Sequence, residues 1–265
     1  MPQLAAIQMN SGADPLHNLQ RAEQGVQQAA QQGAQLVLLP EMFLSLDGQR
    51  YPAIAADPQY VQIVAGWARQ YKLWLVAGAV PMTSPDGDPR VRSASLVFND
   101  QGELVARYDK IHLFDADVGD AHNRYRESER FAPGDEVVVV DTPVGKLGLA
   151  ICYDLRFPGL FQRLREQGAE IISVPAAFTY TTGEAHWQVL LRARAIETQC
   201  YVLAANQCGW HDAQRRTWGH SQIIDPWGQV LSELADEPGV VVAELDAEWL
   251  ADVRRRMPLE QHKRC

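Results

Sequence analysis

The sequence predicts an α/β protein in which two sheets pack face to face and helices cover their outer surfaces. Short apolar runs rich in β-branched residues alternate with helix-like segments along the whole chain. Several of these runs are apolar at every position, which is typical of strands buried on both faces. The strands are too numerous for one ordinary open sheet, and no Pro/Ser-rich linker divides the chain, so we expect a single domain over residues 1–265.

The first half of the chain predicts a strand, a helix and a second strand in close succession. Asp14 is the expected N-cap of the first helix, and Gly33 supplies its stop. The turn Asn99-Asp100-Gln101-Gly102 indicates a hairpin between two later strands. The expected strands are 4–9, 36–39, 74–80, 95–98 and 104–108, and the expected helices are 14–32 and 58–71.

The second half repeats this alternation after a polar, charge-rich loop over residues 115–134. Pro158 suits the first turn of a helix, and Pro226-Trp227-Gly228 indicates a turn. The expected strands are 137–140, 146–151, 171–174, 202–205, 222–224 and 240–245, and a long helix is expected over 183–199.

The net charge of -9 and the pI near 5.3 exclude two classes of protein. A nucleic-acid binder and a polybasic membrane protein both need a positive field toward a polyanion. The N-terminus lacks a basic start followed by a long apolar stretch, and no later apolar run is long enough to span a bilayer. We therefore expect a cytoplasmic enzyme that acts on a small molecule.

The cysteines do not form a recognisable metal or disulfide pattern. Cys152, Cys200, Cys208 and Cys265 show no CxxC pair and no histidine spacing typical of structural zinc. We expect no metal and no organic cofactor. Cys200 and Cys208 lack a neighbouring base and are interpreted as structural, and Cys265 is expected to be exposed at the terminus.

Three residues that could carry chemistry each lie at the end of an apolar strand. Glu41, Lys110 and Cys152 follow the strands 36–39, 104–108 and 146–151. Ligand sites of open α/β sheets lie at the carboxyl ends of strands, and a turn into a helix can lower the pKa of a thiol and offer N–H groups to an oxyanion. Each residue alone also has an ordinary explanation, as a loop carboxylate, a solvated lysine and a small buried side chain.

The segments around these residues resemble a known family. Leu38-Leu39-Pro40-Glu41, Asp109-Lys110-Ile111-His112-Leu113 and Ile151-Cys152-Tyr153-Asp154-Leu155-Arg156-Phe157-Pro158 are similar, in this order, to the three signatures of the nitrilase (carbon-nitrogen hydrolase) superfamily. The resemblance extends over nearly the whole chain. It implies a four-layer αββα sandwich of two mixed sheets, and a homodimer formed through the outer helices with the tail 247–265 at the interface.

The resemblance also implies the site residues. Glu41, Lys110 and Cys152 match a Glu-Lys-Cys triad, and Glu127 matches a second glutamate that helps to position the substrate. In this scheme the Cys152 thiolate attacks an amide carbonyl, and Glu41 acts as base and then as acid. The Lys110 ammonium and the Tyr153 backbone N–H stabilise the oxyanion. A thioester forms on Cys152 and is hydrolysed.

Arginines near these segments are candidates for holding an anionic substrate. Arg124 and Arg126 precede Glu127, and Arg215 and Arg216 precede a segment that also matches the superfamily. Arginine binds a carboxylate through two parallel hydrogen bonds. A role in loop solubility alone remains equally open for them. The alternating charges of the helix segment 192–197 favour a subunit contact.

Within the superfamily, the chain is most similar to the branch that contains deaminated glutathione amidases and omega-amidases. The similarity implies hydrolysis of deaminated glutathione to 2-oxoglutarate and cysteinylglycine, with release of ammonia from 2-oxoglutaramate as the alternative. A catalytically inactive interaction protein on the same scaffold is opposed by the intact Glu41, Lys110 and Cys152 set. A metal- or redox-responsive binding module is opposed by the missing ligand spacing.

Overall fold

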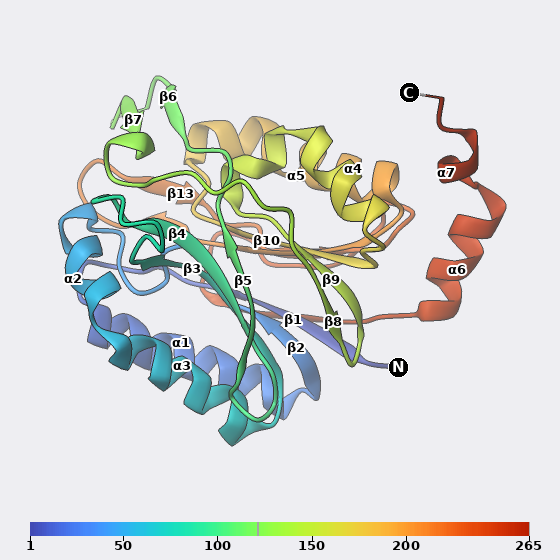
Figure 1. Ribbon diagram of the computed structural model, residues 1–265, viewed down its shortest axis with the longest axis horizontal. Coiled ribbons are helices and arrows are strands. Elements are labelled where there is room, and N and C mark those ends of the chain that lie inside the picture. Colours follow the sequence, from blue (N-terminus) through green and yellow to red (C-terminus); the bar gives the residue numbers. More distant parts are fainter. Residues whose placement is uncertain (121, 265) are drawn as a thin grey trace.

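Two six-stranded mixed sheets stack face to face at the centre of the molecule (Figure 1). The structure is a computed structural model and describes residues 1–120 and 122–264. The first sheet has the strand order β16-β1-β2-β3-β4-β5. Its strands are β1 (Gln3–Gln8), β2 (Ala34–Leu38), β3 (Trp74–Met82), β4 (Arg92–Phe98), β5 (Leu104–Asp109) and β16 (Gly239–Glu244).

The second sheet has the order β15-β14-β11-β10-β9-β8 and is built on the same plan. Three parallel strands stand at its centre, β9 to β11, as β1 to β3 do in the first sheet, and antiparallel strands flank them on both sides. Its strands are β8 (Val139–Thr142), β9 (Gly145–Leu149), β10 (Ile171–Ala176), β11 (Tyr201–Asn206), β14 (Gln222–Ile224) and β15 (Val230–Glu233).

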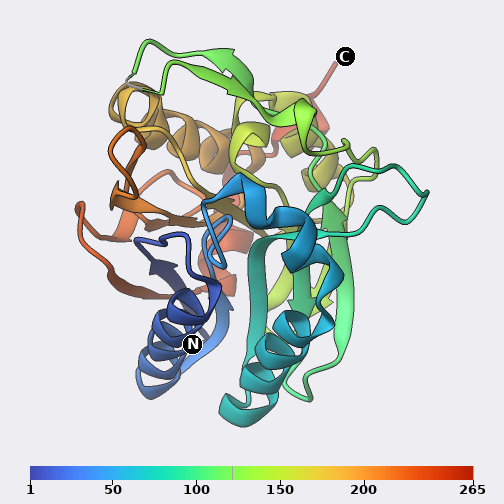
Figure 2. The same ribbon diagram turned by 90° about the vertical axis from the view of Figure 1, so that its left-hand side faces the viewer.

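Helices cover the outer face of each sheet and complete the predicted four layers. Helices α1 (Pro15–Gln31) and α3 (Pro58–Tyr71) lie side by side on the first sheet, and α4 (Pro158–Glu166) and α5 (Tyr180–Thr198) cover the second (Figures 1 and 2). The expected cap of α1 is confirmed, because the Asp14 side chain accepts a hydrogen bond from the Leu16 N–H at 3.0 Å.

The core between the sheets comes from strands that are apolar on both faces. Leu36 and Val76 of the first sheet and Leu149 and Ile172 of the second are fully buried in one continuous cluster. Burial of each such side chain contributes about 1.5–3 kcal/mol to the free energy of unfolding. A second cluster joins the other face of the first sheet to α1 and α3. The continuous apolar runs of the sequence therefore predicted the two-sided burial correctly.

Several elements were not predicted, among them strands of three residues, which are too short to show a periodicity. Within the charge-rich loop, β6 (Asp115–Asp117) pairs with β7 (Arg124–Arg126), and β12 (Cys208–Trp210) pairs with β13 (Arg216–Trp218). The helices α2 (Tyr51–Ala56), α6 (Ala247–Arg256) and α7 (Leu259–His262) were also missed. In Figure 1, α6 and α7 stand apart from the layered body of the molecule.

Strand direction brings the ends of several strands to one region. β2 and β3 are parallel, and two antiparallel steps through β4 return β5 to the same direction. The residues that follow β2 and β5 therefore emerge at one end of the first sheet. Among the described residues, no helix is long and apolar enough to cross a bilayer.

Candidate active site

Residues that follow strands of both sheets meet in one buried cluster. Glu41 follows β2, Lys110 follows β5 and Cys152 follows β9, and Ala177 follows β10. Glu41 is 4% exposed, Lys110 2% and Cys152 8%. We call Glu41, Lys110 and Cys152 the strand-end group. The sequence placed all three at strand ends, and the structure brings them together.

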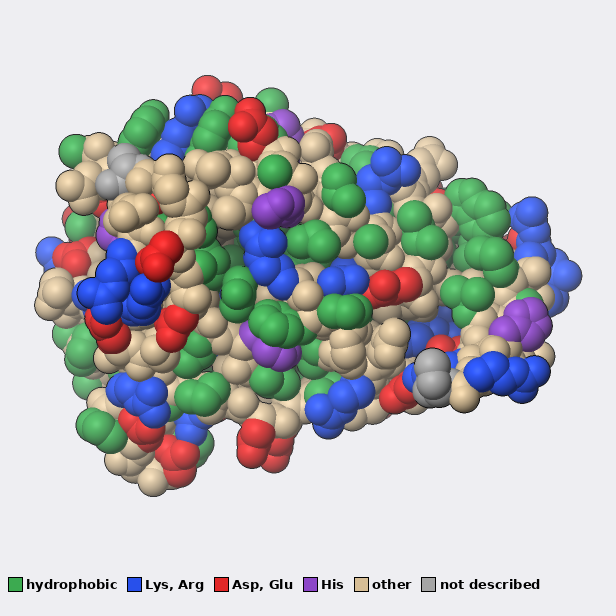
Figure 3. All heavy atoms as spheres, turned by 90° about the horizontal axis from the view of Figure 1, so that it is seen from above, with side chains coloured by type: hydrophobic (Ala, Val, Ile, Leu, Met, Phe, Trp, Pro, Cys, Tyr) green, Lys and Arg blue, Asp and Glu red, His purple; other side chains and the backbone are tan. Residues whose placement is uncertain are grey.

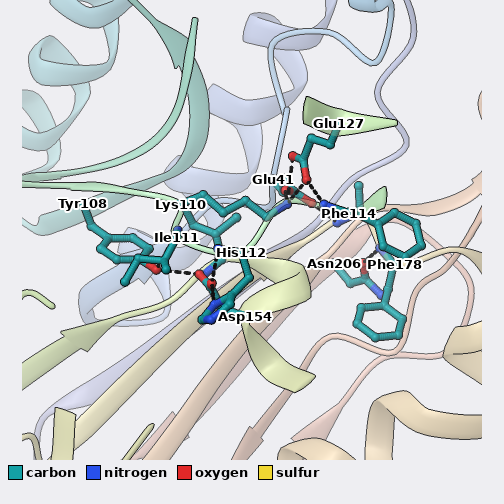
Figure 4. Close-up of polar contacts among 12 residues, drawn as sticks. Glu41, Tyr108, Lys110, Ile111, His112, Phe114, Glu127, Asp154, Phe178 and Asn206 are labelled. Carbon is teal, nitrogen blue, oxygen red and sulfur yellow. Dashed lines mark hydrogen bonds and ion pairs between the residues drawn. The ribbon is translucent and has the colours of Figure 1, made fainter. Parts of the chain in front are cut away.

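The Lys110 ammonium lies between two carboxylates. Its Nζ is 2.9 Å from Oε1 of Glu41 and 2.9 Å from both carboxylate oxygens of Glu127, and Figure 4 shows the side chain reaching between them. Burial alone would lower the pKa of Lys110, but Glu127 and Glu41 outweigh it and hold this pKa well above its usual value. Lys110 is therefore a permanent cation at neutral pH.

Glu127 is held on a different type of element from Glu41. It begins the short 3-10 helix η2 (Glu127–Glu129), and its Oε2 also accepts a hydrogen bond from the Phe114 N–H at 2.6 Å. Burial raises the pKa of Glu127, and Glu41 adds to the rise, whereas Lys110 opposes it. The role in positioning the substrate that the family resemblance implied for Glu127 stays a prediction.

Glu41 is fixed at both of its carboxylate oxygens. Oε1 contacts Lys110, and Oε2 accepts a hydrogen bond from the Ala177 N–H at 2.9 Å. Its backbone carbonyl accepts another from Nε2 of Gln207 at 3.1 Å. A carboxylate held this way has one orientation toward the space in front of Cys152.

Cys152 stands on a strained turn between β9 and the 3-10 helix η3 (Cys152–Arg156). Its φ of +46° lies in the left-handed region, which non-glycine residues adopt only when the surrounding structure imposes it. The predicted lowering of the thiol pKa is wrong. Burial and the neighbouring Glu41 raise the pKa of Cys152 well above its usual range, although Lys110 opposes them, so the resting thiol is protonated.

A cavity of about 380 Å³ opens in front of these residues. Its wall includes the strand-end group and Glu127, and the loop 115–134 supplies part of its rim. Four arginines line it as well, and we call three of them the loop arginines: Arg124, Arg126 and Arg215. Other lining residues are Tyr51, Phe114, His122, Tyr125, Arg130, Phe131 and Thr179.

Comparison with known proteins decides the family. The family model described as carbon-nitrogen hydrolase matches residues 3–255. The chain belongs to the carbon-nitrogen hydrolase family. Its reaction class is the hydrolysis of an amide, and the sandwich of two sheets is the fold of the structures that it resembles.

Curated relatives of this carbon-nitrogen hydrolase share a name. A protein of Yersinia enterocolitica named deaminated glutathione amidase is 49% identical over 265 residues, which cover 98% of this chain and 92% of the relative. A human protein of the same name is 39% identical over 283 residues, covering 100% of this chain and 83% of the relative.

Solved structures are similar over almost the whole chain. The NitFhit protein of Caenorhabditis elegans has a TM-score of 0.92 at 38% identity, covering 99% of this chain and 65% of that one. Saccharomyces cerevisiae Nit3, a member of branch 10 of the nitrilase superfamily, has a TM-score of 0.89 at 32% identity, covering 100% of this chain and 97% of that one. A mutant amidase from Nesterenkonia sp. AN1, with acrylamide added at its active site cysteine, has a TM-score of 0.81 at 29% identity, covering 99% of both chains.

Of the two adjacent arginines 215 and 216, the hydrolase turns only the first into the cavity. Arg216 lies outside the cavity lining, because its guanidinium bonds Asp236 at 2.7 Å and stacks 3.9 Å from the centre of the Tyr180 ring. The prediction that Arg216 holds substrate is therefore not supported. Arg215 donates to the Leu46 carbonyl at 3.2 Å, and among the described residues no carboxylate lies within 4.0 Å of it.

The other two loop arginines are already paired. Arg124 bonds Glu129 at 3.1 Å, and Arg126 bonds Asp117 at 3.0 Å. Both side chains line the cavity, yet each guanidinium already forms an ion pair with a neighbouring carboxylate. Arg215 is therefore better placed than either to receive the carboxylate of a ligand.

A second, smaller cavity that also borders Cys152 was not predicted from the sequence. It measures about 20 Å³ and is lined by Phe114, Tyr153, Arg156 and Phe178 among others. The Arg156 guanidinium lies 5.1 Å from the centre of the Phe178 ring. Arg156 stands four residues after Cys152 within the quoted signature, so its place in that segment could have indicated it.

The remaining described cysteines have structural surroundings, in agreement with the sequence. Cys200 is buried and its thiol donates to the Ala169 carbonyl at 3.1 Å, and Cys208 is buried in β12. Cys265 lies outside the described residues. Among residues 1–120 and 122–264, no group of three His, Cys, Asp or Glu side chains is arranged to hold a metal ion.

Proposed function

We propose that this hydrolase cleaves deaminated glutathione to 2-oxoglutarate and cysteinylglycine through a thioester on Cys152. The observation that carries the proposal is the buried contact of Lys110 with Glu41 and Glu127, directly beside the thiol. The substrate follows from the name shared by relatives at 38–49% identity. No metal or organic cofactor takes part in the proposed steps.

In the acylation step, Glu41 removes the proton from the Cys152 thiol as sulfur attacks the amide carbonyl. The raised pKa of Cys152 supports this order, because a thiol that is neutral at rest needs a base at the moment of attack. The tetrahedral intermediate then collapses, the carbon-nitrogen bond breaks, and Glu41 returns the proton to the leaving amine. The acyl group remains on sulfur.

Two donors stabilise the negative charge on the carbonyl oxygen in this proposal. They are the Lys110 ammonium and the Tyr153 backbone N–H, each contributing roughly 3 kcal/mol to the transition state. The raised pKa of Lys110 supports its part, since the ammonium stays charged at neutral pH. Glu127 holds the ammonium from the other side and so directs it toward the oxyanion.

In the deacylation step, a water molecule attacks the thioester and Glu41 takes its proton. The carbon-sulfur bond breaks, 2-oxoglutarate leaves, and the proton passes to the Cys152 sulfur. Glu41 thus acts in both halves of the reaction. Contacts with Lys110 and the Ala177 N–H hold both carboxylate oxygens of Glu41 in place. This suits a base that serves both steps, because the carboxylate need not move between the attack of the thiol and the attack of water.

The cavity suits a substrate with a negative charge on the amine side. Deaminated glutathione carries one carboxylate on the acyl half and one on the glycine of the leaving dipeptide. A volume of about 380 Å³ accommodates a molecule of this size. We propose that Arg215, whose guanidinium has no carboxylate partner in the described part of the chain, binds the glycine carboxylate. Arg124 and Arg126 add positive charge at the rim.

The test compares two substrates with the same acyl half. Purified protein is given deaminated glutathione or 2-oxoglutaramate, and release of cysteinylglycine or ammonia is measured, with Cys152→Ala as control. We expect the larger kcat/KM on deaminated glutathione and no turnover by the variant. A larger value on 2-oxoglutaramate would make the protein an omega-amidase. No turnover of any amide by the wild type would favour the inactive interaction protein.

We also propose a homodimer through α5 and the tail 247–265. Val189 and Ile196 on α5 are exposed, as is Trp227, whose neighbour Gly228 packs on Ile196. The Trp227 ring lies 6.3 Å from Trp249 of α6, so one apolar surface joins helix and tail. Arg194, in contrast, turns inward and bonds Glu197 within the chain, so its charge is not available to a partner subunit.

Sedimentation of Ile196→Asp tests this interface, with Leu104→Asp on the distant hairpin as matched control. We expect only the first variant to sediment as a monomer, and a monomeric wild type would contradict the proposal.

We further propose that residues 1–265 act as one cytoplasmic domain. The three described cysteines are free thiols, which suits a reducing compartment. In Figure 3, basic and acidic side chains are interspersed over the visible face.

A further inference from the structure

A fully buried carboxylate, Asp154, lies just behind the strand-end group and takes no part in the proposed reaction. Its relative exposure is 0%, and it belongs to η3, two residues after Cys152. A charged group this deep is tolerated only when its oxygens are satisfied by donors. The origin of those donors shows what Asp154 does.

Two residues of the segment that carries Lys110 contact this carboxylate. Oδ2 of Asp154 accepts from the Tyr108 hydroxyl at 2.7 Å, and Oδ1 lies 2.7 Å from Nδ1 of His112 and accepts from the His112 backbone N–H at 3.1 Å. The Tyr108 hydroxyl in turn accepts from the Ile111 N–H at 3.3 Å. Tyr108 and His112 stand on either side of Lys110 in the sequence. Figure 4 shows them converging on Asp154, while the lysine side chain extends to Glu41 and Glu127.

A further donor comes from the turn that carries Cys152. Oδ2 of Asp154 accepts from the Ile151 N–H at 2.9 Å, and the Asp154 N–H donates back to the Ile151 carbonyl at 3.0 Å. These bonds close the turn around the left-handed backbone of Cys152. The same carboxylate therefore braces the strained nucleophile and the segment of the catalytic cation, which belong to different sheets.

We infer that Asp154 is a positioning residue: its carboxylate fixes the separation between the Lys110 ammonium and the Cys152 sulfur. The inference rests on the proposed roles of Lys110 and Cys152. The His112 ring adds to the brace, because it stacks on Phe157 at the end of η3 with ring centres 3.7 Å apart. Displacement of a catalytic group by about 1 Å can cost on the order of 100-fold in rate.

Asp154→Asn is the direct test, because it keeps the shape but places an NH₂ group against one of the donors. We expect kcat on the preferred amide to fall by about 10–100-fold while KM changes little. We also expect the pH midpoint for alkylation of Cys152 by iodoacetamide to rise, because Lys110 opposes the raised pKa of this thiol and would lie farther from it. Tyr108→Phe removes one donor and should move both quantities less, in the same direction.

Asp225→Asn is the matched control for loss of a buried carboxylate. Asp225 is 4% exposed and accepts from the Trp227 N–H at 2.9 Å, the Gln229 N–H at 2.8 Å and Nε1 of Trp249 at 2.9 Å, and it lines neither cavity. A purely structural Asp154 would behave like Asp225. Both variants would then lose thermal stability but keep kcat per folded molecule and the alkylation midpoint.

Three results therefore separate the possibilities. A fall in kcat with a shifted alkylation midpoint in Asp154→Asn and Tyr108→Phe, but not in Asp225→Asn, supports the inference. Unchanged values in folded Asp154→Asn overturn it. If that variant does not fold, Tyr108→Phe decides, since it keeps the ring that fills the core. Loss of activity by Cys152→Ala tests the proposed function separately, so failure of the two ideas can be distinguished.

Discussion

The strand-end group and the loop arginines face the same cavity but are supported in different ways. Glu41, Lys110 and Cys152 are all at most 8% exposed and follow strands of the two stacked sheets. The Arg124 side chain is 65% exposed, and Arg215 is half-buried on the connection between two short strands. A rigid scaffold fixes groups whose positions must be accurate, whereas loops can change with the substrate. The chemistry should therefore depend on the first set, and substrate preference on the second.

Removal of Glu41 should have the largest effect. Glu41→Gln keeps the size of the side chain but cannot accept a proton, so kcat should fall by about 10²–10⁴-fold. Intact mass spectrometry after mixing with substrate should detect an acyl adduct on Cys152, because deacylation needs the same base. Glu170→Gln is the matched control, because the Glu170 carboxylate also accepts a hydrogen bond from a backbone N–H, at 2.9 Å. This variant should be fully active. An adduct on Cys200 or Cys208 would contradict the assignment.

Replacement of Lys110 should change the pH dependence of the thiol. Because the pKa of Cys152 is raised, alkylation by iodoacetamide should still accelerate as the pH rises past 9.0. Lys110 favours the thiolate, so Lys110→Met should move the midpoint to still higher pH. Lys146→Met is the control, because the Lys146 ammonium forms an exposed ion pair with Asp141 at 3.9 Å. This variant should leave the pH profile of alkylation unchanged. A midpoint that falls in Lys110→Met would show that Lys110 does not act on the thiol.

Arg215 should affect one substrate only. Arg215→Gln should lower kcat/KM on deaminated glutathione by roughly 10–100-fold, as expected for a lost hydrogen bond to a charged group. It should have little effect on 2-oxoglutaramate, which lacks the glycine carboxylate. Arg216→Gln serves as control, because that guanidinium is already paired with Asp236. An equal loss on both substrates would instead place Arg215 at the acyl half.

Arg124 should have the smallest effect. It is exposed, and its bond to Glu129 is a surface ion pair of about 0–1 kcal/mol. Arg124→Gln should change kcat/KM by less than about fivefold, and this small change should shrink further as salt is added. Steady-state kinetics at two ionic strengths would measure it. A loss as large as that of Arg215→Gln would mean that loop exposure is a poor guide to substrate contact.

The sequence predicted the strand-end group and the layers because both depend on long, regular patterns. Glu41 and Cys152 each follow a continuous apolar run, and such runs indicate where a buried strand ends, whereas Lys110 follows the partly exposed edge strand β5. Short strands such as β7 and β13 have no such pattern, so the direction in which their arginines point was not predictable. Arg215 and Arg216 are adjacent and chemically identical. Only the pairing of β12 with β13 turns one toward the cavity and the other toward Asp236.

The lowered thiol pKa was mispredicted for a related reason. A turn into a helix was expected to favour the thiolate, but in the structure burial and Glu41 act more strongly on Cys152 than Lys110 does. Burial depth depends on the packing of both sheets and cannot be read from the local motif. Asp154, in the same segment, was passed over as well, because only the fold shows that its partners come from the chain around Lys110.

The pairing of β16 with β1 has a consequence for synthesis of the chain. β1 is made before β16, and its outer edge pairs with β16, with Gln3 opposite Glu244 and Gln8 opposite Gly239. Until the ribosome has released residues near 244, the unpaired amides and carbonyls of β1 are a template for strands of other chains. A polypeptide that stops before β16 would thus leave this edge open and should aggregate, even though it contains every residue of the strand-end group.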